Sequence, residues 1–153
     1  MISRSNDMII EEKVIGKILL FPYEIQEALD LGLKPEHFSD FKLGELFKEM
    51  TSVYLENAKI DISTLSWDYE ELLNFIEDNE ITSIELSVKK IIENYRNRIL
   101  EKEIQKILLS GGKSEEKIKK ILKTVEKVEE ISFSKNRTYS PSEIVGEFME
   151  KLG

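Results

Sequence analysis

The segment Ser110-Gly111-Gly112-Lys113-Ser114 has the composition of the last part of a nucleotide-binding phosphate loop. Such a loop wraps consecutive backbone N–H groups around phosphates. Its motif needs a glycine five positions before the second glycine, and a strand leading into the loop. Here Ile107 occupies the glycine position, and the preceding residues have helical periodicity. We therefore predict a turn between two helices, in which Gly111 or Gly112 ends the first helix and Ser114 caps the second.

No other group of residues forms a recognisable catalytic or metal-binding pattern. The chain has one histidine, His37, and no cysteine, which excludes the usual zinc ligand sets and a thiolate nucleophile. No residue beside His37 gives a catalytic spacing. The acidic clusters at residues 68–71 and 77–80 fit the ends of short helices, where carboxylates cap N–H groups and complement helix dipoles. We predict no catalytic, cofactor-binding or metal-binding residue in this chain.

Arg98, Lys102 and Lys106 recur every four residues and form a basic ridge on a predicted helix. The ridge fits either a phosphate-contacting surface or an exposed face of mixed charge, since glutamates interrupt the region. Residues 1–100 carry 20 acidic and 11 basic side chains, whereas residues 101–130 carry seven acidic and eight basic. Because nucleic-acid affinity rests mainly on Lys and Arg, the acidic part of the chain suits protein partners better than nucleic acid.

The elements that position these residues are predicted to be helices. Apolar residues make up 41% of the chain and charged residues 34%, with only three prolines, which is typical of a helical globular protein. Apolar residues recur at three- and four-residue spacings, and alternating strand patterns are absent. We predict an all-α protein with a compact helical bundle at residues 1–82, a long antiparallel helical hairpin at residues 83–131, and a linker with a C-terminal linker helix at residues 132–153.

Within the bundle, the sequence marks several helix ends. The first helix should end before Pro22, which suits the first turn of a second helix, and Gly32 should close that second helix. A third helix should then end near Asn57. Asp61 and Asp68 are suitable N-caps for two further short helices.

The predicted hairpin carries more apolar surface than an isolated monomer normally exposes. Packing of its two helices against each other buries part of each apolar stripe, and a second, symmetry-related hairpin can bury the rest. The alternative is that the hairpin packs back on its own bundle. We predict self-association through Ile104, Ile107, Leu108, Ile118, Ile121, Leu122 and Val125.

The last predicted helix begins at Ser140-Pro141-Ser142-Glu143, which combines a capping box with a proline at the first helical position. Its apolar face has no neighbour in sequence, so we expect it to dock elsewhere or on another chain through Ile144, Val145, Phe148 and Leu152. No apolar run reaches the length of a membrane span, and the N-terminus lacks a signal pattern. We expect a cytoplasmic protein without a membrane partner.

Residues 11–22, EEKVIGKILLFP, combine an acidic residue, a V/I-L/I-G-like step and a later proline. This stretch resembles the opening helix of the N-terminal domain in replicative DNA helicases of the DnaB type. Residues 33–40, LKPEHFSD, resemble the family element L-x-P-E-D-F-x-D, and Leu46-Phe47 falls on its I-F pair without a gap. Residues 57–65, NAKIDISTL, match G-x-P-I-D-x-x-T-L. Order and spacing agree across residues 11–65, and the likeness continues more loosely through the predicted hairpin.

This resemblance implies a non-catalytic collar domain at the replication fork. In that family, hairpin-to-hairpin dimers assemble into a ring described as a trimer of dimers, which gives a hexamer for the parent protein. The collar receives primase and in some systems a helicase loader. A linker helix, here residues 140–152, leads to a RecA-like motor that uses ATP and Mg²⁺ and translocates on single-stranded DNA. Since no motor sequence lies within these 153 residues, the resemblance implies a fragment with no cofactor of its own.

The chain departs from the family pattern at particular positions. Leu43 and Gly44 stand where the family often has His-Arg, His37 replaces an acidic residue, and the glycine-rich entry to the fifth helix is missing. Two alternatives stay open. The helicase-binding C-terminal domain of a primase has a similar bundle and hairpin, although it normally ends after the hairpin. A small nucleic-acid-binding module would use the basic ridge.

Overall fold

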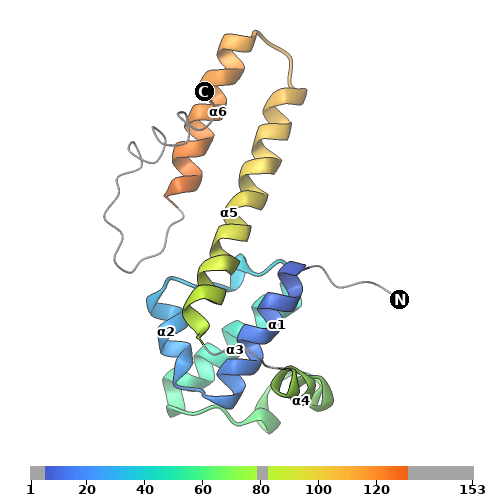
Figure 1. Ribbon diagram of the computed structural model, residues 1–153, viewed down its shortest axis with the longest axis vertical. Helices are drawn as coiled ribbons and strands as arrows, with labels where there is room; N and C mark the ends of the chain where they lie inside the picture. The colour runs from blue at the N-terminus through green and yellow to red at the C-terminus, as the bar shows by residue number, and fades with distance from the viewer. Residues whose placement is uncertain (1–5, 79–82, 131–153) are drawn as a thin grey trace. The chain divides into compact units, whose positions relative to one another are not determined.

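The computed structural model describes residues 6–78 and 83–130, and every regular element in these ranges is a helix (Figure 1). This confirms the all-α prediction. In chain order the elements are α1 (Asn6–Leu20), α2 (Glu24–Asp30), η1 (Pro35–His37), α3 (Phe41–Asn57), η2 (Ile62–Thr64), α4 (Tyr69–Glu77), α5 (Ile84–Leu109) and α6 (Ser114–Glu129), where η marks a short 3-10 helix.

The chain divides into two compact units, Met1–Ile92 and Glu93–Gly153, and the division falls inside the continuous helix α5. Unit 1 holds α1 to α4 with the first turns of α5, and unit 2 holds the rest of α5 with α6. The predicted domain boundaries at residues 82/83 and 131/132 stay predictions.

Unit 1 is built around one apolar core. Helix α1 packs against α4, and α3 packs against η1 (Figure 1). Burying one large aliphatic or aromatic side chain stabilises a fold by about 1.5–3 kcal/mol. The large side chains that are almost fully buried in this unit are those of Ile15, Ile18, Ile25, Leu31, Leu43, Phe47, Met50, Leu72, Ile91 and Ile92.

In unit 1, the helix ends follow the local sequence signals with one shift. Gly32 takes the left-handed conformation after α2, with φ of 93°, and the Leu33 N–H donates to the Ala28 carbonyl at 3.0 Å. Such a bond satisfies a carbonyl left open at the helix end. Pro22 lies in the turn before α2 rather than in its first turn, since the N-cap is Tyr23.

Aspartate side chains cap three elements at their N-termini. The Asp40 carboxylate accepts from the Lys42 N–H at 2.9 Å at the start of α3. The Asp61 carboxylate accepts from the Ser63 N–H at the start of η2. The Asp68 carboxylate accepts from the Glu71 N–H at 3.2 Å at the start of α4. These bonds confirm the two predicted caps and show that the acidic cluster at residues 68–71 belongs to a helix N-terminus.

Within the described ranges, no helix is long and apolar enough to cross a membrane. The predicted linker helix at residues 140–152, with Ile144, Val145, Phe148 and Leu152, lies outside the described residues.

Candidate interaction surfaces

The segment that resembles a phosphate loop is the turn between α5 and α6. A helix rather than a strand leads into it, which confirms the predicted helix-to-helix turn. Gly112 has φ of 127°, a backbone conformation that favours glycine, and no atom lies within 4 Å of a Cβ built on Gly111. The predicted Ser114 cap is wrong by one residue. Ser114 is the first residue of α6, and Lys113 occupies the N-cap without a side-chain bond.

Helices α5 and α6 run in opposite directions on either side of this turn (Figure 1). Near the turn, the Lys117 Nζ donates to the Leu108 carbonyl at 3.2 Å. Far from the turn, the Arg96 guanidinium forms a salt bridge with the Glu129 carboxylate, and both side chains are mostly buried. The two interactions join α5 to α6 at opposite ends of α6.

The residues predicted for self-association differ in exposure. Leu108 is 57% exposed and Ile118 is 54% exposed, whereas Ile104, Ile107, Ile121 and Leu122 are half-buried. Val125 is only 2% exposed, so a substitution there perturbs folding as well as any assembly.

Leu109, which the sequence interpretation left out of the self-association set, is 88% exposed. Ile107 and Leu109 lie about 200° apart around the helix axis, so Leu109 falls outside an apolar stripe that contains Ile107. That signal was present in the sequence. We use the name tip patch for Leu108, Leu109 and Ile118.

The basic ridge predicted on α5 already makes contacts within the protein. The Lys106 Nζ lies 3.4 Å from a Glu103 carboxylate oxygen, and the Arg98 guanidinium lies 5.8 Å from the centre of the Tyr95 ring. These contacts favour the interpretation of an exposed face of mixed charge over a surface reserved for phosphates.

His37 is buried and has a structural role in the η1 turn. Its Nδ1 accepts from the Lys34 N–H at 3.0 Å, which is the bond that the acidic residue of the family pattern can make. No cluster of three or more His, Cys, Asp or Glu side chains suited to a metal ion occurs in the part of the chain that the structure describes.

Glu11 and Gly44 fix the η1 loop between α1 and α3. The Glu11 carboxylate is 1% exposed, and both of its oxygens lie 3.0 Å from the Ser39 backbone nitrogen. The Ser39 hydroxyl donates to the same carboxylate at 3.1 Å.

A Cβ added to Gly44 would lie 2.4 Å from the Pro35 carbonyl oxygen. The departure from His-Arg at positions 43 and 44 therefore has a packing reason, because Leu43 is buried and Gly44 lets α3 approach η1.

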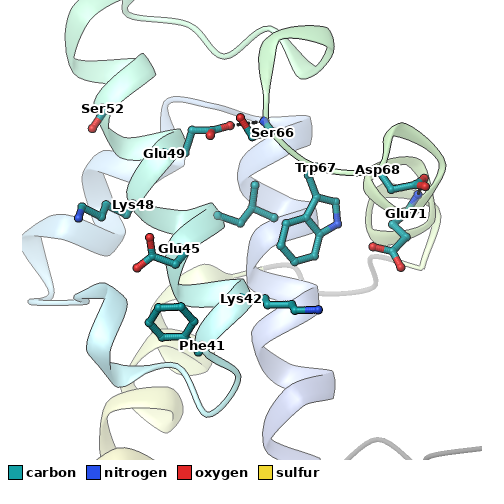
Figure 2. A pocket seen from close by; sticks show the side chains of 11 residues that line it. Phe41, Lys42, Glu45, Lys48, Glu49, Ser52, Ser66, Trp67, Asp68 and Glu71 are labelled. Carbon is teal, nitrogen blue, oxygen red and sulfur yellow. Dashed lines mark hydrogen bonds between the residues drawn. The ribbon is translucent and has the colours of Figure 1, made fainter.

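A groove of about 740 Å³ lies in unit 1 between α3 and the segment that leads into α4. Figure 2 shows Phe41, Lys42, Glu45 and Glu49 along α3, and Lys42 and Glu49 project toward Trp67 and the segment before α4. The Glu49 carboxylate accepts a hydrogen bond from the Ser66 N–H, which ties this segment to α3. We call this hollow the α3–α4 groove.

The described residues therefore form an all-α protein with a capped helical bundle and two antiparallel helices after it. A sequence model described as the DnaB-like helicase N-terminal domain matches residues 3–101, about two-thirds of the chain. The chain belongs to this family, the N-terminal domain of DnaB-like replicative helicases. The match begins before α1 and ends within α5, so α6 lies beyond it. No curated protein matches the chain.

Proposed function

We propose that this chain is a non-catalytic assembly and partner-docking domain of a replicative DNA helicase. The observation that carries the proposal is the family match over residues 3–101. The tip patch supports the assembly part, because its three large apolar side chains are each more than half exposed next to one turn. Grouped exposed apolar side chains mark protein association sites more often than isolated ones do.

In this proposal, the α5–α6 hairpin pairs with the hairpin of a second copy, and such dimers assemble as a trimer of dimers in a hexameric parent protein. The collar then receives primase and, in some systems, a loader. ATP hydrolysis with Mg²⁺ and translocation on single-stranded DNA belong to a RecA-like motor domain of the parent, in the cytoplasm. The support for these roles is the family membership and the resemblance of residues 11–65.

The two alternative functions have weaker support. The family match is to the helicase and not to a primase, which favours the helicase side of that interaction. A nucleic-acid-binding module is disfavoured by the contacts of Arg98 and Lys106 within the protein and by the net charge of −8.

Light scattering on the Leu108→Asp/Ile118→Asp double variant tests the assembly proposal. Both residues are exposed, so the fold should tolerate the change, whereas an apolar interface should not. Truncation of a central interface residue costs about 2 kcal/mol or more, which is about 30-fold in dissociation constant per site. We expect the variant to have the mass of a monomer at concentrations where the unmodified chain is assembled.

The matched control is Leu55→Asp/Leu86→Asp, which replaces two leucines that are 66% and 73% exposed and lie outside the tip patch. It should keep the mass of the unmodified chain. If the tip variant keeps that mass too while its helical circular dichroism is unchanged, the tip patch is not the interface.

A further inference from the structure

Two large aromatic side chains, Phe41 and Trp67, line the α3–α4 groove. Phe41 is 78% exposed at one end of the groove (Figure 2). Trp67 lines the side of the groove next to α4, and its buried indole N–H has no hydrogen-bond partner among the residues that the structure describes. A buried indole N–H usually finds an acceptor, but this one is covered by protein atoms, so the groove presents the ring of Trp67 rather than its N–H.

The aromatic side chains of the groove are held in place before any partner arrives. The centre of the Trp67 ring lies 6.3 Å from that of the Phe75 ring in a tilted arrangement, and the Trp67 backbone N–H donates to the Leu65 carbonyl at 2.9 Å. The Ser66 bond to Glu49 holds the same segment on α3. A preformed surface of this kind loses little conformational entropy on binding.

The groove extends beyond Phe41 into a second hollow. This hollow has a volume of about 480 Å³ and shares Phe41, Glu45 and Lys48 with the α3–α4 groove. Phe41 therefore stands between two concave surfaces, in the position of an aromatic contact for an elongated segment.

The negative charge of the groove favours a positively charged partner. Four carboxylates and two lysines line it, and two of the carboxylates, Glu49 and Asp68, accept backbone hydrogen bonds. The side chains of Glu45 and Glu71 line the groove and make no hydrogen bond or ion pair with any described residue. Residues 1–92 carry 19 acidic and nine basic side chains, so the surroundings add to the negative potential.

We propose that the α3–α4 groove binds a cationic amphipathic segment of a partner protein. An apolar side chain of that segment lies against Phe41 and Trp67, and a lysine or arginine pairs with Glu45 or Glu71. The inference rests on the proposed partner-docking function, and it places the docking site in unit 1, on different residues from the tip patch. Two other occupants fit less well: nucleic acid meets the wrong charge, and a second copy of this acidic unit repels the first.

Trp67 is the only tryptophan, so its fluorescence reports on the groove of the intact chain. The probe is a synthetic 14-residue peptide with a leucine face and a lysine face, and the control peptide replaces its lysines with glutamates. We expect a saturable change of Trp67 emission with the lysine peptide and none with the glutamate peptide. Phe41→Ala and Glu45→Lys should each weaken binding about tenfold.

Two matched variants on α3 distinguish the groove from general acidity. Leu55→Ala removes an exposed apolar side chain, and Glu56→Lys reverses an exposed charge, both outside the groove. They should bind within about twofold of the unmodified chain. Equal weakening in groove and control variants, or no saturable change, overturns the proposal. So does the same emission change with a single-stranded oligonucleotide, or on raising the protein concentration alone.

The outcomes separate this inference from the proposed assembly. If the Leu108→Asp/Ile118→Asp variant keeps its assembled mass while Phe41→Ala loses the peptide, the assembly proposal fails and the groove proposal stands. If the tip variant becomes monomeric while Phe41→Ala binds the lysine peptide normally, only the groove proposal fails.

Discussion

Replacement of Glu11 by glutamine should destabilise unit 1 by about 2–3 kcal/mol. The carboxylate is almost fully buried, and both oxygens lie 3.0 Å from the Ser39 nitrogen, so the N–H is shared between them. In glutamine, one oxygen becomes an NH₂ group that faces this donor. Hydrogen bonds to a charged group contribute about 1.5–3 kcal/mol each, and the Ser39 hydroxyl bond also loses its charged acceptor.

The assay is urea unfolding followed by Trp67 fluorescence, because the only tryptophan lies in unit 1 together with Glu11. In a separate thermal unfolding experiment on a chain of this size, the expected loss of about 2–3 kcal/mol in the free energy of unfolding lowers the midpoint temperature by about 4–12 °C. Glu56→Gln is the control, since this exposed glutamate on α3 makes no hydrogen bond or ion pair with the described residues. If Glu11→Gln unfolds within about 0.5 kcal/mol of the control, the carboxylate does not hold the loop and the reasoning is refuted.

Three further predictions concern the backbone and charge contacts. Gly44→Ala should destabilise by about 1–3 kcal/mol despite the better helix propensity of alanine, because its Cβ meets a backbone oxygen, whereas Gly111→Ala should be neutral in thermal unfolding. Arg96→Ala and Glu129→Ala should show a coupling energy of about 0.5–3 kcal/mol in a double-mutant cycle, and additivity would contradict it. Hydrogen bonds from the side chain and backbone of Ser63 hold the pKa of Asp61 below its ordinary value. Its stabilising contribution is therefore present above the ordinary pKa and lost as pH falls through the lowered one, and an NMR titration of this carboxyl checks the direction.

Local signals made most of the fold predictable from the sequence. Gly32, Asp61 and Asp68 act on backbone groups within a few residues, so their effect on helix ends can be seen in the sequence itself. The buried stripe of α3 is equally local, because it depends only on the 3.6-residue period.

Contacts between distant residues could not be predicted in the same way. Glu11 and Ser39 are 28 positions apart, and nothing in either segment specifies their pairing. From the sequence, Gly44 was only a departure from the family pattern. The structure explains it, because the nearby Pro35 carbonyl leaves no room for a Cβ at this position. The α3–α4 groove depends on where the Ser66–Trp67 segment lies against α3, although Phe41 gave a partial signal as an apolar residue off the buried stripe.

The predicted self-association set shows that a periodic pattern identifies apolar positions on a helix but not their exposure. Its members lie on α5 and α6, but the pattern did not separate exposed from buried members, since Val125 is buried and Leu108 is not. Exposure depends on how the helices pack, which the stripe alone does not determine.

The most direct test of the proposed assembly is the mass of the chain in solution, measured by light scattering over a range of concentrations with the tip variant alongside. The account predicts an assembled state for the unmodified chain and for Leu55→Asp/Leu86→Asp, and a monomer for Leu108→Asp/Ile118→Asp. A monomer for the unmodified chain at every concentration, or an assembled tip variant, would contradict it.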